Sequence, residues 1–396
     1  MRTCYKNFTL IDGNGTKPLE KAYFIVEDGV IKEIGVNLDH ERKDIRDIVD
    51  LQSKFVMPGL IDCHTHISIL PLADNRHILT DYTQTDLIVL AIQHLKEMLH
   101  GGVTYIRDLG DVKGLTLSLK KYLRDGSIEG PEMITSGIPV TMTGGHAHMI
   151  AREADGIDEV TKAVREQIKN GSDIIKVFSS GGVCTPGCDV NAYQFNEEEL
   201  RAAAVEAHKV GKKITTHCHA LEGTKNSIRA GLDCIEHATI LDDEAIDMIV
   251  ESGTYLVPTF SAVYYILENG EKAGIPKEYV DKTKMISTSH MENIYKAFKK
   301  GANIAMGTDA GTPFNLFGIS SAFELELMER AGFSPNEILQ IATKNGAELL
   351  GISEMYGTLE VGKIADFLVL DENPLTNIRT VQNLRAVYKK GKKVNR

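Results

Sequence analysis

The sequence lacks the features that identify membrane and nucleic-acid-binding proteins. No apolar run approaches the roughly 20 residues of a membrane-spanning helix. The N-terminal segment MRTCYKNFTLIDG is polar and has no signal-peptide core, which predicts a cytoplasmic protein without a membrane partner. There is no long basic tract, and a formal net charge of −11 argues against a nucleic-acid partner. No G-x-G-x-x-G or Walker pattern surrounds the glycines of SSGGV, so we interpret them as a tight turn.

Cysteine is also scarce, with six residues in a chain of 396. This usage fits a reducing compartment without a disulfide framework. Cys184 and Cys188 have no second cysteine pair to complete a zinc knuckle, so we interpret them as an inert loop pair. With 42% hydrophobic and 25% charged residues, the composition is that of a soluble globular protein. The length suits one large barrel with a small additional domain.

The two ends of the chain have the pattern of short strands and tight turns. IDGNGTKP and VEDGVIKEIG contain Asn-Gly or Asp-Gly pairs, which supply the positive φ angles of hairpin turns. The C-terminal segments GTLEVGKIADFLVLDENP and LRAVYKKGKKV look alike, with a turn expected at Lys390-Gly391. We therefore predict that residues 1–57 and 357–396 pair into one composite β-sandwich domain.

The middle of the chain, residues 58–356, alternates between helical and strand-like segments. One helix is expected after Asn196 as N-cap, with a capping box to Glu199 and a C-cap at Gly211. Another is expected over 334–351, from SPNEILQIATKNGAELLG. Short apolar runs follow the helices: VTYIRD, DIIKVF, KITTH, DCIEH, TYLVPTF and NIAMGTD. This alternation is typical of parallel βα units, and it predicts an eight-stranded (β/α)8 TIM barrel of the α/β class.

Six side chains that suit metal binding lie at the ends of these apolar runs. The chemistry of such barrels is located where strands end and βα loops begin, so all six are expected at one rim. Two histidines two residues apart on a strand face the same side and can bind one metal together. Imidazoles and a carboxylate suit Zn²⁺ or a similar first-row ion. The six are His64 and His66 in IDCHTHIS, Lys176 in SDIIKVFSSGG, His217 in KKITTHCHA, His237 in LDCIEHAT and Asp309 in IAMGTDAG.

Lys176 is the unusual member of this set. A buried lysine is costly to keep charged, so its pKa falls and the neutral amine becomes nucleophilic. It can then add carbon dioxide to give a carbamate, whose two oxygens can bridge two metal ions. The alternative is a strand-end lysine whose amine reaches solvent. For Asp309 the alternative is a helix N-cap.

These motifs together resemble the amidohydrolase superfamily. The matching segments are MPGLIDCHTHI, TGGH, IIKVFSSGGV, HCHA, IEHA and GTDAG, and the resemblance extends over nearly the whole chain to GTLEVGKIADFLVLD. The branch that the chain resembles most contains imidazolonepropionase-like enzymes, with metal-dependent Xaa-Pro dipeptidases (prolidase-like) and related carboxypeptidases. The resemblance implies a hydrolase acting on the amide bond of a small molecule, and it implies homo-oligomers.

The resemblance also implies a role for each candidate residue. His64, His66 and Asp309 would bind one divalent ion, with zinc expected, and His217 and His237 would bind a second. N6-carboxylated Lys176 would bridge the two ions. Asp309 would act as the catalytic general base and then acid. His146 of TGGH would stabilise the oxyanion and contact the substrate, whereas His148 is expected to be a polar loop residue. From their positions in the sequence rather than from the resemblance, His219, two residues after His217, and Tyr193, in the loop after the Lys176 strand, are expected to contact the substrate. The helical or loop stretches of His77, His94, His100, His208 and His290 predict solvated side chains.

The chain departs from its relatives at the fifth strand of the barrel. Many dipeptidases of the branch have His-Ala-Tyr there, where this chain has His217-Cys218-His219, so an imidazole replaces a substrate-binding phenol. Deaminases of the superfamily usually have a glutamate three residues after the first histidine, where this chain has Ala220. We therefore expect a two-metal hydrolase of a dipeptide (Xaa-Pro or similar) or an N-acyl amino acid. The alternatives are a cyclic amide or amidine hydrolase, a one-metal deaminase and a non-catalytic scaffold.

Overall fold

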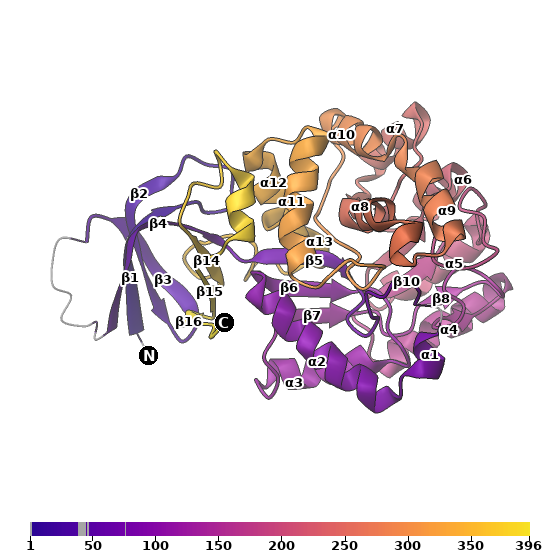
Figure 1. The fold of residues 1–396 in the computed structure, drawn as a ribbon, viewed down its shortest axis with the longest axis horizontal. Coiled ribbons are helices and arrows are strands. Elements are labelled where there is room, and N and C mark those ends of the chain that lie inside the picture. The colour runs from indigo at the N-terminus through magenta and orange to yellow at the C-terminus, as the bar shows by residue number, and fades with distance from the viewer. Residues whose placement is uncertain (1, 39–44, 46, 76) are drawn as a thin grey trace.

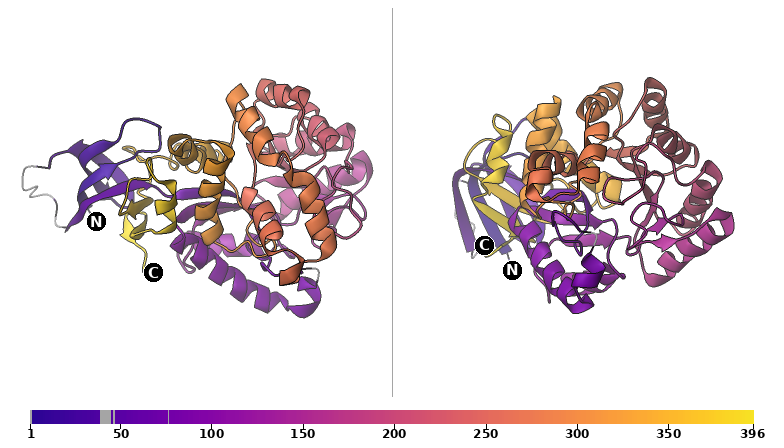
Figure 2. Two further views of the ribbon diagram at one scale, coloured as in Figure 1. Left: turned by 45° about the horizontal axis from the view of Figure 1, so that its top comes forward. Right: turned by 45° about the vertical axis from the view of Figure 1, so that its right-hand side comes forward.

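The protein is described by a computed structural model that covers residues 2–38, 45, 47–75 and 77–396. A β-sheet lies at one end and a larger body of helices and strands at the other, with both chain ends on the side of the sheet (Figure 1). The two further views in Figure 2 show the same separation of the sheet from the larger body.

Both ends of the chain contribute to one seven-stranded sheet. Its strand order is β16-β15-β14-β4-β1-β2-β3, in which β1 and β4 are parallel and the other neighbours are antiparallel. The turns at Asp28-Gly29 and Lys390-Gly391 have positive φ at both residues, as tight hairpins require. The strands are β1 (Arg2–Leu10), β2 (Leu19–Glu27), β3 (Val30–Val36), β4 (Asp47–Pro58), β14 (Phe367–Leu370), β15 (Ala386–Lys389) and β16 (Lys392–Lys393).

Both faces of this sheet bury apolar side chains. Phe24 lies 5.0 Å from Phe367 between ring centroids, and Tyr388 stacks on Phe367 at 4.4 Å. Ile25 follows Phe24 in β2 and therefore faces the opposite side, where it packs with Cys4. Residues from both chain ends thus share one core. The β-sandwich architecture and the domain limits 1–57 with 357–396, and 58–356, stay predictions.

The larger body contains parallel strands at the predicted places. Two sheets with the strand orders β5-β6-β7 and β13-β12-β11-β10-β8-β9 make up its interior. The VTYIRD run forms β6 residue for residue, whereas the TYLVPTF run leaves the strand after Val257. The strands are β5 (Leu60–Thr65), β6 (Val103–Asp108), β7 (Glu132–Thr135), β8 (Val140–Thr141), β9 (Arg152–Glu153), β10 (Ile175–Phe178), β11 (Ile214–Cys218), β12 (Cys234–His237) and β13 (Tyr255–Val257).

The last predicted strand, 303–309, is not a continuous strand in the structure. Isolated parallel bridges join Ile304 to Leu256 of β13 and Ala310 to Thr65 of β5. At Thr308 the backbone groups are shared with side chains, although its N–H also lies 3.3 Å from the His64 carbonyl oxygen of β5. The Asp62 carboxylate accepts its N–H at 3.1 Å, and the Asn315 amide donates to its carbonyl at 2.7 Å. The segment nevertheless lies between the free edges of the two sheets.

Helices alternate with these strands, and their beginnings follow the predicted caps. Asn196 forms a capping box with Glu199, as Ser334 does with Glu337. Two helix ends differ from the prediction. The helix after Asn196 ends at His208 rather than near Gly211, and the predicted 334–351 helix breaks at Thr343, whose φ of −135° leaves the helical region. The helices are α1 (Ile78–Asp81), α2 (Gln84–His100), α3 (Leu115–Arg124), α4 (Gly156–Asn170), α5 (Glu197–His208), α6 (Leu221–Arg229), α7 (Asp243–Ser252), α8 (Phe260–Asn269), α9 (Lys277–Ser287), α10 (His290–Lys300), α11 (Ile319–Ala331), α12 (Pro335–Ile341), α13 (Lys344–Leu350), η1 (Glu271–Ala273) and η2 (Ile378–Gln382).

Two histidines that were predicted to be solvated are buried. The His94 ring stacks on Phe317 with 4.0 Å between centroids, and its Nδ1 lies 2.9 Å from the Ile67 carbonyl oxygen. His290, at the start of α10, has its Nε2 3.0 Å from the carbonyl oxygen of His237. The prediction was wrong because each ring finds a backbone partner inside the body, which offsets the cost of burying a polar group.

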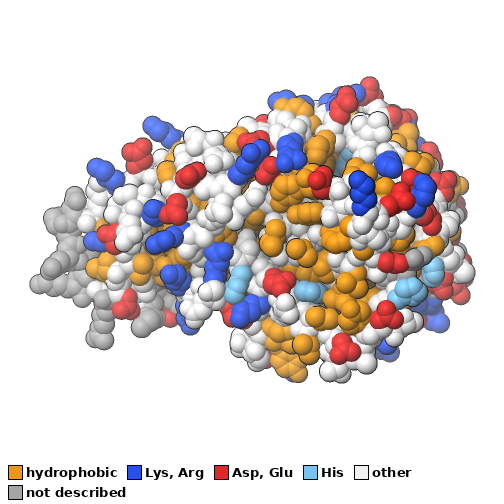
Figure 3. All heavy atoms as spheres, in the orientation of Figure 1, with side chains coloured by type: hydrophobic (Ala, Val, Ile, Leu, Met, Phe, Trp, Pro, Cys, Tyr) orange, Lys and Arg blue, Asp and Glu red, His pale blue; other side chains and the backbone are white. Residues whose placement is uncertain are grey.

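The surface agrees with the lack of basic tracts in the sequence. Among the described residues, no helix combines the length and the apolar character that a membrane crossing requires. Acidic and basic side chains are intermingled over the face shown in Figure 3, without a large area of one sign.

Candidate metal centre

The six predicted metal-binding residues line one cavity. Each is positioned by the end of a strand of the body or by the 303–310 segment between the sheets. His64 belongs to β5, and His66 follows it directly. Lys176, His217 and His237 belong to β10, β11 and β12. Residues far apart in the sequence therefore meet at one end of the parallel strands, as the sequence predicts.

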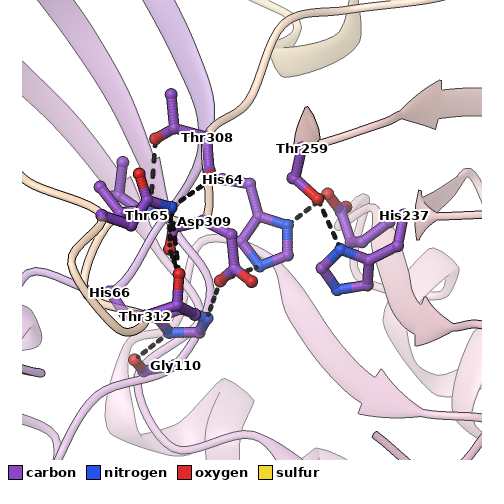
Figure 4. A network of polar contacts seen from close by, with 12 residues as sticks. His64, Thr65, His66, Gly110, His237, Thr259, Thr308, Asp309 and Thr312 are labelled. Carbon is purple, nitrogen blue, oxygen red and sulfur yellow. Dashed lines mark hydrogen bonds and ion pairs between the residues drawn. The ribbon is translucent and has the colours of Figure 1, made fainter. Parts of the chain in front are cut away.

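His64, His66 and Asp309 form the tightest group, with one ligand atom from each within 4.8 Å of the others. Figure 4 shows both imidazoles directed toward the Asp309 carboxylate. Its Oδ1 lies 3.1 Å from His66 Nε2 and 3.4 Å from His64 Nε2. Ligands at about 2.0–2.2 Å around a tetrahedral zinc ion stand roughly 3.3 Å from one another. The spacing therefore fits a zinc-sized ion.

The protonation of His66 also fits a metal ligand. Its Nδ1 lies 2.8 Å from the Gly110 carbonyl oxygen, which can only accept a hydrogen bond. One proton is therefore on Nδ1, and in the neutral ring the lone pair of Nε2 faces Asp309. A lone pair 3.1 Å from a carboxylate oxygen is unfavourable unless a metal ion or a proton lies between them. Burial lowers the pKa of His66, but the hydrogen bond and the charge of Asp309 outweigh it and raise this pKa, so a proton can take the place that a metal ion would fill. The same kind of hydrogen bond fixes the orientation of metal-binding histidines in general.

His217 and His237 lie beside this group, with 4.6 Å between their ring centroids. His237 is 5.1 Å from His64 by the same measure, so the four rings are contiguous. Thr259 Oγ1 lies 2.7 Å from His237 Nδ1 and orients that ring (Figure 4). Burial lowers the pKa of His64 to about 4 and holds the pKa values of His217 and His237 well below the usual range. Neutral imidazoles with available lone pairs are the form that binds metals.

Lys176 lines the same cavity as these histidines, and only 2% of its surface is exposed. Its Nζ has no hydrogen-bond partner among the described residues. Burial lowers the pKa of this amine to about 8, so the neutral form is accessible near neutral pH. A buried amine without a partner is costly, and it therefore points to a missing group at this position. The predicted solvent-reaching alternative for Lys176 is wrong.

The backbone is strained where three of the site residues lie. His237, Thr259 and Asp309 have φ angles of 68°, 54° and 59°, a backbone region that residues other than glycine rarely adopt. Each such residue costs on the order of 1–3 kcal/mol, which the surrounding packing must offset. At His237 the strain has a visible effect. Glu236 and His237 are consecutive in β12, yet both side chains approach His64. Glu236 Oε2 lies 2.9 Å from His64 Nδ1, and the His237 ring centroid lies 5.1 Å from that of His64.

His146 lines the cavity next to His217, with 4.4 Å between ring centroids. Thr185 Oγ1 accepts the Ala147 N–H at 2.9 Å, so its own proton is free for His146 Nδ1, 2.8 Å away. This arrangement allows the tautomer with the proton on Nε2, in which the Thr185 hydroxyl donates to Nδ1. Burial lowers the pKa of His146 to about 3, so the ring is neutral and can donate one hydrogen bond.

Of the other two predicted substrate contacts, one lines the cavity and one does not. His219 lines the cavity at 4% exposure, with its Nδ1 3.0 Å from Thr239 Oγ1. Tyr193 is 51% exposed and does not belong to the cavity lining, although its backbone pairs with that of the buried Ser180. His148 is exposed, as predicted. Away from the histidines, the cavity wall is largely apolar, with Ile69, Ile78, Ala262, Val263, Ile266 and Ile286.

Glu236 and Arg107 are among the fully buried charged residues that sequence reasoning missed. Arg107 of β6 lies 2.7 Å from Glu236 Oε1 through Nη2, and neither side chain is exposed. The sequence does contain an indication of their burial, because each lies inside a short, largely apolar run, CIEH or VTYIRD. A charged residue that is buried with such a run needs a partner of opposite charge. Its partner could not be read from the sequence, since 129 positions separate the two.

A model of the amidohydrolase family matches residues 55–394. The chain belongs to the amidohydrolase family. Ochratoxinase of Aspergillus niger is 32% identical over 413 residues, covering 96% of this chain and 83% of that protein. The crystal structure of a Xaa-Pro dipeptidase with methionine bound in its active site has a TM-score of 0.93, with 30% identity and full coverage of both chains. A prolidase complexed with N-methylphosphonate-L-proline has a TM-score of 0.91 and 28% identity, covering 100% of each chain.

Membership of this family, together with relatives that cleave amides, makes the chain a hydrolase acting on C–N bonds. A more distant relative is the 5-methylthioadenosine/S-adenosylhomocysteine deaminase of Bacillus cereus, 23% identical over 94% of this chain and 86% of that protein. The comparisons therefore confirm the family and the class of enzyme that the motifs indicate.

Proposed function

We propose that this amidohydrolase is a two-metal enzyme that cleaves the amide bond of a dipeptide or an N-acyl amino acid. The observation that carries the proposal is the buried amine of Lys176, which has no hydrogen-bond partner among the described residues and lines the same cavity as both sets of possible ligands. His64, His66 and Asp309 would hold one zinc ion, and His217 and His237 the other. Carboxylated Lys176 would bridge them, since two cations need an anionic ligand between them.

The proposed scaffold is a closed eight-stranded barrel. The 303–310 segment supports it, because this segment hydrogen-bonds to both sheet edges. Ala305 donates to the Leu256 carbonyl at 3.0 Å, and Cys63 donates to the Met306 carbonyl at 2.8 Å. Closure would fix the ligands at one rim, where the barrels of this architecture have their active sites.

When bound, the metal ions would supply a hydroxide nucleophile near neutral pH and polarise the amide carbonyl. Asp309 would accept the proton of the nucleophile and deliver it to the leaving nitrogen. His146 would donate its Nε2 proton to the carbonyl oxygen as negative charge develops there. Thr185 is compatible with this role, because its hydroxyl can donate to Nδ1 of the tautomer that carries the proton on Nε2.

The substrate would place its scissile amide beside the histidines and an apolar group against α8. Ala262, Val263 and Ile266 form that wall. His219 would hydrogen-bond a polar group of the substrate in place of the phenol found in many dipeptidases. A deaminase is less well supported, because Ala220 stands where deaminases usually have a glutamate and because Lys176 is buried without a partner.

Metal analysis combined with a substrate screen tests the proposed function. Reconstituted protein is expected to bind two zinc ions per chain and to release free amino acid from dipeptides or N-acyl amino acids, detected by mass. Substrates with a bulky apolar side group are expected to be cleaved faster than acetyl or glycyl analogues, since the cavity wall is apolar. One ion per chain would favour a deaminase, and none would favour a non-catalytic scaffold.

His219→Phe is expected to raise KM about tenfold, while metal content stays at the wild-type level. The change removes one hydrogen bond to the substrate, whose loss in a buried site costs roughly 1–3 kcal/mol. Steady-state kinetics and metal analysis of the purified variant measure both quantities. Loss of a metal ion from this variant would instead make His219 a ligand.

A further inference from the structure

Glu236 lies directly beneath the proposed metal site and has an unusual division of contacts. Its Oε1 is occupied by Arg107 Nη2 at 2.7 Å and by the Thr215 hydroxyl. Its Oε2 lies 2.9 Å from His64 Nδ1 and has no aligned hydrogen bond among the described residues. The second oxygen therefore faces His64, and the charge of the carboxylate also acts on the buried Lys176 amine. Glu236 itself has no exposed surface.

The charge of Glu236 is maintained by its surroundings. Arg107 is equally buried, and it also donates through Nε to the Cys63 carbonyl, one residue before His64 in β5. The guanidinium is thereby fixed against both Glu236 and the strand that carries His64. A buried carboxylate that is paired on one oxygen retains its charge, and its other oxygen is a strong acceptor.

We propose that Glu236 is a positioning residue for His64, which accepts the Nδ1 proton and thereby directs the Nε2 lone pair toward the metal ion held with His66 and Asp309. The carboxylate would raise the basicity of the His64 ring and hold its orientation. Arg107 would hold Glu236 in turn. This inference rests on the proposed metal site and extends it to residues that touch neither the ion nor the substrate.

A purely structural role of the Arg107–Glu236 pair is the competing explanation. Its removal would then reduce stability without a specific effect on metal affinity. The two roles are separable, because replacing both charges with neutral residues removes the unpaired buried charge that a single replacement leaves behind. The double variant R107M/E236Q therefore tests the positioning role in a chain without that defect.

The test is a titration of metal-free protein with Zn²⁺ in competition with a chromophoric chelator, alongside thermal unfolding. E236Q is expected to bind one zinc equivalent 10–100-fold more weakly than the wild type and to have a lower Tm. R107M/E236Q is expected to recover Tm while the affinity stays reduced. E244Q removes a carboxylate that is 67% exposed on α7 and is expected to bind zinc like the wild type. The visible absorption of bound Co²⁺ is expected to change in both Glu236 variants only.

Wild-type affinity for both zinc equivalents in folded R107M/E236Q would overturn the positioning role. An unchanged Co²⁺ spectrum in that variant would do the same. A wild-type chain that binds a single zinc ion would contradict the two-metal function, and the affinity of that ion in E236Q would still decide the role of Glu236. A wild-type chain that binds no zinc would overturn both proposals.

Discussion

Lys176→Ala is expected to lose activity by roughly 10³-fold or more and to retain at most one zinc ion per chain. Without the lysine there is no bridging anion, so the second ion loses a ligand and the contribution of metal catalysis, several kcal/mol, is lost. Short carboxylates such as acetate are expected to restore part of the activity and of the metal content, because they can occupy the space of the side chain and supply two oxygens.

Activity assays and metal analysis with and without acetate measure this effect. Lys213→Ala is the matched control, because the Lys213 amine donates to the Leu349 carbonyl at 2.6 Å, near the start of β11 and away from the cavity lining. It is expected to keep both metals. Carbon-13 NMR of protein exchanged with labelled bicarbonate detects the carbamate directly. Two tightly bound metals and full activity in Lys176→Ala would remove the carbamate from the mechanism.

Asp309→Asn is expected to lower kcat by roughly 10²–10⁴-fold through loss of proton transfer alone. An amide cannot accept the proton of the nucleophile, and it replaces a charged ligand with a neutral one. Affinity for the metal held with His64 and His66 is therefore also expected to fall. Steady-state kinetics at saturating zinc separates the two effects, since excess metal offsets weak binding but not the missing base.

Asp111→Asn provides the control for Asp309→Asn. Asp111 is a buried carboxylate after β6 that accepts the N–H groups of Gly114 and Thr116 outside the cavity lining. Its replacement is expected to lower the free energy of unfolding without changing metal stoichiometry. If Asp309→Asn retained wild-type kcat at saturating zinc, another residue would be the base.

The sequence was sufficient for the parts of the protein that local patterns encode. The hairpin at Lys390-Gly391 followed from the need for positive φ, and the helix starts at Asn196 and Ser334 followed from capping chemistry. The alternation of helices and short apolar runs indicated parallel strands. Because such strands all end at one rim, the meeting of His64 with Asp309 was predictable without knowing any distance.

Other features depended on contacts between distant segments. The 303–309 run was expected to be a regular strand, but it has only an isolated bridge at Ile304, and side chains of Asp62 and Asn315 contact the backbone groups of Thr308. His94 and His290 were expected in solvent, but each is buried against a carbonyl of another segment.

What the sequence determined by itself is the set of candidate metal-binding side chains and their placement at or near the ends of short apolar runs. What only the tertiary structure decided is how those side chains are oriented. Consecutive residues of a regular strand face opposite ways, yet the left-handed backbone at His237 brings both it and Glu236 to His64. Strain of this kind persists only because the packed body offsets its cost, and that packing is a property of the whole fold.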